Sequence, residues 1–193
     1  MPALFISILH LLTTLVTFGI IRPKKSRFSA VLNAMHSIYD ELHLLNDKAG
    51  CTRSLILKTE NGGGVPRLGV SLFSSVLYEA YSGKGGSIRK SWQQERLDEE
   101  YVNMLLSVMA NGQVRLVTAD MAESRLKTLY TANDVEESMV FLLAVEETRL
   151  IYLTLNCCES DDTGTEHTPA HEEAMRAGVN RLKQIFDKNP SEL

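Results

Sequence analysis

The first apolar stretch of the chain is long and uninterrupted by charge. Residues 3–21 read ALFISILHLLTTLVTFGII and contain no Asp, Glu, Lys or Arg. At about 1.5 Å per residue, a helix of this length can cross a hydrocarbon core of roughly 30 Å. A helix buried in a soluble core would show a polar stripe, which this run lacks. We therefore predict a transmembrane helix over residues 1–22 that contacts membrane lipid through residues 3–21.

A short basic segment, residues 23–27, follows this run. Four membrane-flanking cations lie close together there and just before it: Arg22, Lys24, Lys25 and Arg27. A cleaved signal peptide would carry its positive charge ahead of the apolar run and a small-residue site after it. Cationic flanks stay on the cytoplasmic side of a membrane. The pattern predicts a single-pass membrane protein whose soluble part is cytoplasmic.

Downstream, apolar residues recur at the spacing of an amphipathic helix from Phe28 to Leu45, and Gly50 is a suitable residue for its C-terminal cap. Residues 52–58 then favour a strand, residues 61–66 a turn, and residues 68–81 a second strand that pairs with the first.

The second half alternates in the same way. A helical stripe covers residues 97–109, and Asn111-Gly112 closes it. A short strand (114–118) and a short helix (124–130) follow. Residues 139–145 and 150–157 read as a hairpin, and a last helix begins at Thr168-Pro169. Residues 188–193 form a tail.

This order of elements predicts an α+β domain over residues 28–187, built on one mainly antiparallel sheet flanked by helices and preceded by the transmembrane helix. The first and last helices each offer one apolar stripe. We therefore expect them to lie side by side on the same face of the sheet.

The pattern resembles the GAF domain, within the PAS/GAF group of sensory folds. The residues that carry the resemblance are the helix Phe28–Lys48, the strand Cys51–Lys58, residues 112–120 (GQVRLVTAD) and residues 137–143 (ESMVFLL). The resemblance implies a small-molecule pocket on one face of the sheet, or a pocket that was lost while the fold was kept for dimerisation.

Charge narrows the classes of partner. The chain carries 24 acidic and 20 basic residues, with a formal net charge of −4. Four of the cations lie in the first 28 residues, which contain no acid, so the body is more acidic than the whole. An acidic body does not favour nucleic acid, because affinity for nucleic acid comes mostly from neutralising phosphates.

The cysteines suggest free thiols. Three are present, Cys51, Cys157 and Cys158, and an odd number does not fit a disulfide framework. Cys157-Cys158 with His167 and His171 could suggest zinc, but successive strand residues point to opposite faces. We expect neither a metal nor a cofactor.

A basic glycine-rich loop, residues 82–91, precedes the only tryptophan, Trp92. This loop, with Lys84 and Trp92 as ligand-binding residues, could hold a small anionic ligand or lie against anionic headgroups, and it could equally be a solvated loop. Four further residues could line a GAF-type pocket: Tyr78, Tyr101, Arg115 and Tyr130. The alternative is that these tyrosines lie at half-buried edges of the core. The acidic runs at 98–100 and 136–137 look like helix-start charges.

These patterns favour a membrane-tethered, non-enzymatic sensory or protein-interaction module that binds a small ligand or a partner. The anchor and first helix would pair copies into a homodimer or join another membrane protein. The alternative is a structural or assembly membrane protein with a ligand-free GAF-like fold. Cysteine-based enzymatic chemistry is less favoured, because Cys51 lies far in sequence from the other two cysteines.

Overall fold

The computed structural model describes residues 27–61, 67–82, 86–158 and 169–188. The chain divides into two compact units, Met1–Asn33 and Ala34–Leu193. Of the first unit, the described residues form only the start of a helix. The predicted membrane span, residues 1–22, lies outside the described residues, as do Lys24 and Lys25. Within the described ranges, no helix combines the length and apolar character needed to cross a bilayer.

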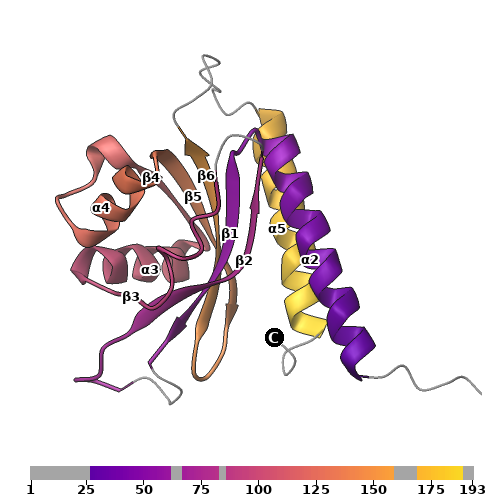
Figure 1. Cartoon of the computed structure of the whole chain (residues 1–193), viewed down its shortest axis with the longest axis horizontal. Helices are drawn as coiled ribbons and strands as arrows, with labels where there is room; N and C mark the ends of the chain where they lie inside the picture. Colours follow the sequence, from indigo (N-terminus) through magenta and orange to yellow (C-terminus); the bar gives the residue numbers. More distant parts are fainter. Residues whose placement is uncertain (1–26, 62–66, 83–85, 159–168, 189–193) are drawn as a thin grey trace, which may run out of the picture. The chain divides into compact units, whose positions relative to one another are not determined.

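The described strands form a six-stranded sheet in the order β3-β2-β1-β6-β5-β4 (Figure 1). Every neighbouring pair is antiparallel. The strands are β1 (Arg53–Glu60), β2 (Phe73–Tyr81), β3 (Glu95–Arg96), β4 (Gln113–Val117), β5 (Val135–Val145) and β6 (Leu150–Cys158). This confirms the predicted α+β class, its mainly antiparallel sheet and both predicted hairpins.

Helices α2 (Arg27–Ala49) and α5 (Pro169–Lys188) pack together on one face of the sheet (Figure 1). The guanidinium of Arg181 donates to both carboxylate oxygens of Glu41, at 2.7 and 2.8 Å. Glu41 is buried and the Arg181 side chain is 46% exposed, so a charge-assisted pair joins the two helices at the edge of their interface. A second contact needs a small residue, because a Cβ at Gly178 would lie 2.4 Å from Leu45 Cδ2. The predicted pairing of the terminal helices is confirmed.

The other face carries α3 (Glu99–Asn111), the 3₁₀ turn η1 (Thr118–Asp120) and α4 (Arg125–Ala132). Asp98 begins α3, because its carboxylate accepts hydrogen bonds from the backbone N–H groups of Tyr101, at 2.9 Å, and Arg125, at 2.8 Å. Asp98 therefore caps α3 and also holds the first residue of α4, whose own N-cap is Ser124. Gly112 ends α3 with φ of 77°, a left-handed conformation that glycine adopts without strain.

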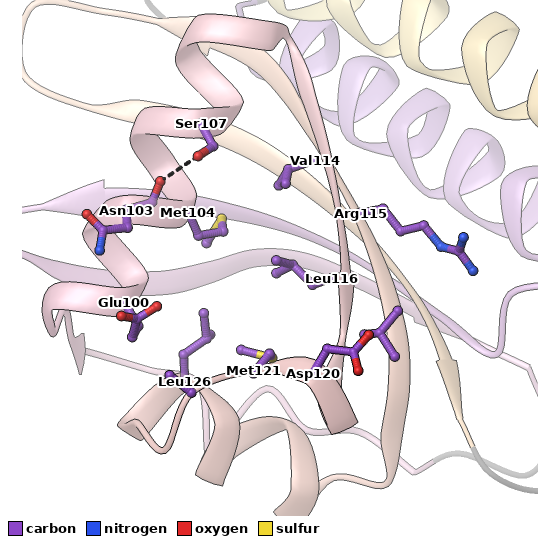
Figure 2. A pocket seen from close by; sticks show the side chains of 12 residues that line it. Glu100, Asn103, Met104, Ser107, Val114, Arg115, Leu116, Asp120, Met121 and Leu126 are labelled. Carbon is purple, nitrogen blue, oxygen red and sulfur yellow. Dashed lines mark hydrogen bonds between the residues drawn. The ribbon is translucent and has the colours of Figure 1, made fainter.

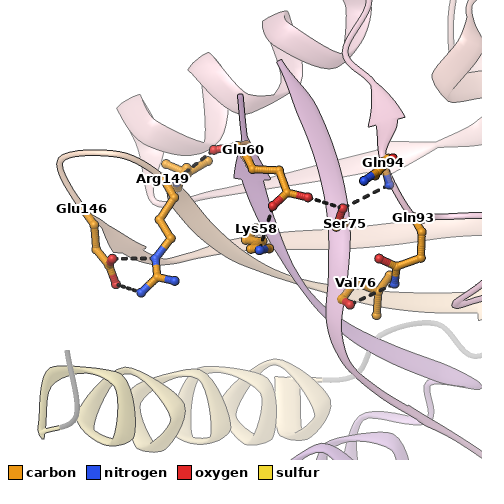
Figure 3. A network of polar contacts seen from close by, with 10 residues as sticks. Lys58, Glu60, Ser75, Val76, Gln93, Gln94, Glu146 and Arg149 are labelled. Atoms are coloured by element: carbon orange, nitrogen blue, oxygen red, sulfur yellow. Dashed lines mark hydrogen bonds and ion pairs between the residues drawn. The ribbon is translucent and has the colours of Figure 1, made fainter. Parts of the chain in front are cut away.

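A polar network holds the loop before α3 against the β1–β2 hairpin (Figure 3). The Glu60 carboxylate accepts from the Ser75 hydroxyl at 2.7 Å and lies 2.7 Å from Lys58 Nζ. The bond from Lys58 is the main reason that the pKa of Glu60 is lowered. The Gln94 backbone N–H donates to Ser75 Oγ at 3.0 Å. This network positions β3, a strand of two residues that sequence patterning did not predict.

Two expectations from sequence need correction. Glu136 and Glu137 are not helix-start charges, because both lie in β5, which begins at Val135. Instead, the carboxylate of Glu137 forms an ion pair with Arg115 on the neighbouring strand β4. The second predicted strand begins at Phe73 rather than Leu68, after a short turn at residues 68–70.

Candidate functional site

Four buried aromatic side chains form a layer within the otherwise aliphatic core between the sheet and the helices α3 and α4. Trp92, Tyr101, Tyr130 and Tyr152 are each at most 1% exposed. Trp92 packs on Tyr130 with ring centroids 5.6 Å apart. These bulky rings fill the middle of this face of the sheet. Space for a ligand is therefore expected nearer the edge of the sheet.

A chain of hydroxyl groups runs through this aromatic layer. Tyr152 Oη lies 2.5 Å from Ser74 Oγ and 2.7 Å from Tyr101 Oη. Burial raises the pKa of Tyr101, Tyr130 and Tyr152 well above that of a free tyrosine, because water cannot stabilise a phenolate there. The tyrosines stay neutral and can serve as hydrogen-bond donors and acceptors.

An open hollow of about 440 Å³ lies beside this layer, between α3, β4, η1 and the start of α4. Its size falls in the range of about 300–1,000 Å³ that is usual for small-molecule sites. Apolar side chains form most of its walls, and Figure 2 shows them directed inward: Met104, Val114, Leu116, Met121 and Leu126. The outer lining is polar and includes Glu100, Asn103, Ser107 and Asp120.

The charge of this rim is negative. Glu100 and Asp120 carry the carboxylates (Figure 2). Arg115 belongs to the lining, but its side chain extends away from the hollow, because strand residues alternate between the two faces of a sheet. Its guanidinium instead donates to both oxygens of Glu137, at 2.6 and 2.7 Å. That contact raises the pKa of Arg115.

On the opposite face of β4 and β5, a smaller hollow of about 250 Å³ lies near the first turns of α5. It is lined by Gln113, Arg115, Met139, Phe141, Glu172, Met175 and Arg176. Arg176 lies 3.4 Å from Glu172, and Arg115 is held by Glu137, so both cations have acidic partners. The lining here is less apolar than that of the hollow beside α3, since Met139, Phe141 and Met175 are its only apolar residues.

The structure separates the residues that sequence reasoning grouped as ligand-binding. Trp92, Tyr101 and Tyr130 meet in the aromatic layer, and none of them lines either hollow. Tyr78 lies on the other face of the sheet, with its ring 5.5 Å from that of Tyr39. Lys84 lies outside the described residues. Arg115 is the one member that borders a hollow, and it borders both.

The rim residues on α3 were missed by sequence reasoning. Glu100, Asn103 and Ser107 are spaced three and four apart, so they share one side of the helix with Met104. That spacing was readable as a polar edge next to an apolar stripe. For metals, the described residues contain no cluster of three or more His, Cys, Asp or Glu side chains placed to hold an ion.

Comparison with known proteins identifies the fold. No protein-family model matches the chain, and no curated protein has a matching sequence. Solved structures do match. A far-red cyanobacteriochrome photoreceptor aligns with a TM-score of 0.58 and 14% identity, over 93% of this chain and 98% of that chain. A GAF domain/HD domain protein from Geobacter sulfurreducens aligns with a TM-score of 0.55 and 9% identity, over 80% and 92%.

A third structure agrees with these two. The PixJ GAF domain of Thermosynechococcus elongatus, in its blue-light absorbing form, aligns with a TM-score of 0.51 and 9% identity, over 86% of this chain and 94% of that one. The described part of the chain therefore has the GAF fold, as the sequence resemblance implied. At these identities the likeness concerns the fold alone, and the residues of this chain must indicate what it binds.

Proposed function

We propose that this protein is a membrane-tethered, non-enzymatic sensory module whose GAF-fold domain binds a small ligand in the hollow between α3, β4 and η1. The observation that carries the proposal is the hollow itself, about 440 Å³ with apolar walls and a polar rim. Solved structures with the same fold include a photoreceptor, which is a sensory protein.

The lining predicts the chemistry of the ligand. Five apolar side chains favour an apolar body, and the carboxylates of Glu100 and Asp120 favour a cationic or hydrogen-bond-donating end. An anionic ligand, which the basic loop around Lys84 suggested, would meet two like charges at this rim. We therefore propose a neutral or cationic amphipathic molecule for this hollow.

Asn103→Trp will abolish ligand binding, because the indole would occupy the mouth of the hollow. The wild-type full chain, purified in a mild non-ionic detergent, is expected to carry a non-covalent small molecule in native mass spectrometry. The Asn103→Trp variant is expected to retain less than about a tenth of that adduct, since steric exclusion of this size costs more than about 1.4 kcal/mol.

Ala110→Trp is the matched control. Ala110 is also exposed on α3, but it does not line the hollow, so this variant should keep the adduct. Loss of the adduct from both variants would point to damage to α3 rather than to occupation of the hollow. A wild-type chain without any co-purified small molecule would contradict the ligand-binding proposal.

The tether is proposed from sequence. Leu11→Arg together with Val16→Arg should release the chain from membranes, because each arginine near the centre of a span costs about 2.5–3.5 kcal/mol on insertion. Fractionation after alkaline carbonate washing measures the effect. The wild type is expected in the pellet, with its C-terminal domain protected from protease added outside intact cells. A paired Arg22→Gln and Lys24→Gln variant should stay in the pellet, and a soluble wild type would refute the tether.

A second candidate function, protein interaction without a ligand, is favoured by one feature. Val102, Leu106 and Met109 form an exposed apolar stripe along α3, at 38%, 58% and 48% exposure. Residues at this spacing share one side of a helix, as helices that dock partners do. The proposed dimer would be compatible with either function. Native mass spectrometry separates the two, since a dimer or hetero-complex without a small molecule would favour the interaction module.

A further inference from the structure

Two cysteines that are 106 positions apart in sequence meet in the fold. Cys51 follows Gly50 at the end of α2 and precedes β1, and it is 3% exposed. Cys157 lies near the end of β6 and is partly exposed. Both belong to the layer between the sheet and the helices α2 and α5. No local sequence pattern predicts that Cys51 and Cys157 meet, because their proximity depends on the pairing of β1 with β6.

Hydrogen bonds between the residues next to the two cysteines fix the backbone there. Thr52 N–H and Thr52 Oγ1 both donate to the Asn156 carbonyl, each at 3.0 Å. Arg53 lies directly opposite Asn156 in the ladder between β1 and β6. Cys51 and Cys157 adjoin this pair of residues, so the ladder brings the two thiols close together in one apolar layer, within reach of a mutual hydrogen bond. The Cys51 thiol also donates to the Ala49 carbonyl at 3.8 Å. Neither thiol is in a disulfide in this structure.

The environment makes the two thiols unequal. The hydrogen bond with Cys51 is the main cause that lowers the pKa of Cys157, and the nearby guanidinium of Arg115 acts in the same direction. Burial and the carboxylates of Glu137 and Glu136 oppose this shift. A partly exposed thiol with a lowered pKa reacts faster than a buried one. Cys157 is therefore the accessible partner and Cys51 the shielded one.

We propose that Cys51 and Cys157 are a redox-active dithiol that forms a reversible intrachain disulfide, with Cys157 attacking first and Cys51 resolving. The co-substrate is a low-molecular-weight disulfide such as glutathione disulfide. This site is independent of the ligand hollow, which lies on the other face of the sheet.

The exchange balances in two steps. The Cys157 thiolate attacks one sulfur of glutathione disulfide, forming a mixed disulfide and releasing one glutathione thiolate, which takes up a proton. Cys51 then loses its proton, attacks the Cys157 sulfur and releases the second glutathione. The protein loses two electrons and two protons in total, and the small disulfide gains them as two thiols. The buried position of Cys51 is no obstacle, because its attack is intramolecular.

Oxidation would add a covalent link between the α2–β1 junction and the end of β6, which the sheet joins through backbone hydrogen bonds. Cys51 stands at the junction of α2 with β1, where Gly50 has φ of 67°. Cys157 stands one residue before the end of β6, the strand that precedes α5. A disulfide between them would link the exit of α2 to the end of the central strand.

The test uses the full-length chain with Cys158→Ser, so that only Cys51 and Cys157 remain. After incubation with glutathione disulfide at neutral pH, remaining thiols are blocked with iodoacetamide and the protein is digested with trypsin. We expect the peptide of residues 49–53 joined to the peptide of residues 150–176, and dithiothreitol should separate them. The emission of Trp92 before and after oxidation reports whether the domain stays folded.

Three variants in the same background complete the test. Cys157→Ser should leave Cys51 unmodified in the folded protein. Cys51→Ser should stop at the mixed disulfide on Cys157. Cys51→Ala should slow alkylation of Cys157 at neutral pH by about threefold or more, because the hydrogen bond that favours the thiolate is lost.

Separate glutathione adducts without a joined peptide, or disulfides only between chains, would overturn the proposal. An alkylation rate for Cys157 that is unchanged by Cys51→Ala would do so too, since it would show that the thiols do not interact. Because the readouts are disulfide mapping and thiol reactivity, they remain valid whether or not a ligand occupies the hollow.

Discussion

Replacing Tyr152 with alanine will lower the free energy of unfolding by about 4 kcal/mol, the cost typical of truncating a large buried aromatic residue. Tyr152 is fully buried on β6, between β1 and β5, and its hydroxyl contacts both Ser74 and Tyr101. The truncation leaves a cavity in the aromatic layer and removes the hydrogen-bond partner of two buried hydroxyl groups. Such a loss is a large part of the roughly 5–15 kcal/mol that stabilises a typical domain.

Urea unfolding of the full chain in detergent, followed by the emission of Trp92, measures this loss, because Trp92 is the only tryptophan and is buried beside Tyr130. Tyr152→Phe separates the two contributions. It keeps the ring and should cost only about 1–3 kcal/mol, from the buried hydroxyls left without their partner. Tyr81→Ala is the control, since Tyr81 is 46% exposed and should change stability by less than about 0.5 kcal/mol.

Equal losses for Tyr152→Ala and Tyr152→Phe would contradict this division, because they would mean that the ring contributes nothing. A loss below about 1 kcal/mol for the alanine variant would mean that the aromatic layer can collapse into the space that the ring vacates.

Gly178→Val will destabilise the domain by about 2–3 kcal/mol, through overpacking where α2 crosses α5. The first side-chain carbon would lie 2.4 Å from Leu45 Cδ2 and 2.8 Å from Leu45 Cγ. Leu45 is 1% exposed and has core neighbours on its other sides, so it cannot move aside freely. Replacing glycine inside a helix would otherwise be favourable, and the sign of the effect therefore reports the clash.

A double-mutant cycle with Leu45→Ala tests this cause. When Leu45 is shortened, a valine at 178 fills the space, so the cost of Gly178→Val should fall by more than about 1 kcal/mol. Asn180→Val, at an exposed position of the same helix, controls for the helix propensity of valine. Additive effects of Gly178→Val and Leu45→Ala would show that the two positions are not in contact.

Helical periodicity allowed the helices to be predicted from sequence nearly to the residue. The apolar stripe from Phe28 to Leu45 lies in α2, and the dipeptide Asn111-Gly112 correctly predicted the end of α3. Periodicity works there because each helix buries one side against the sheet. The β5–β6 hairpin followed in the same way, from two apolar runs joined by the tight turn that Glu146 and Arg149 close with hydrogen bonds.

Polar residues inside strands were harder to interpret. Glu136 is exposed on β5, and Glu137 is accommodated there because Arg115 on β4 forms an ion pair with it. No local pattern announces such a partner, since the two strands are joined by way of η1 and α4. The two-residue β3 also depends on contacts with Ser75, which are distant in sequence.

The candidate site shows why residue type alone does not identify a lining. Tyrosine and tryptophan are common both in pockets and in cores, and here Trp92, Tyr101 and Tyr130 complete the core. Arg115 was expected to face a ligand, but strand alternation directs it to Glu137. The hollow is formed instead by ordinary apolar residues with a polar edge on α3, a combination that only the three-dimensional packing reveals.

The order of the strands has a consequence for synthesis on the ribosome. The partners of β1 are β2, which follows at once, and β6, whose Asn156 lies 104 residues beyond Thr52. When β1 emerges, the edge that pairs with β6 stays unpaired until almost the entire domain has been translated. A nascent β1–β2 hairpin therefore exposes a hydrophobic strand edge for many seconds, at roughly 5–20 residues per second. We expect the emerging chain to depend on chaperones until β6 inserts and closes the sheet.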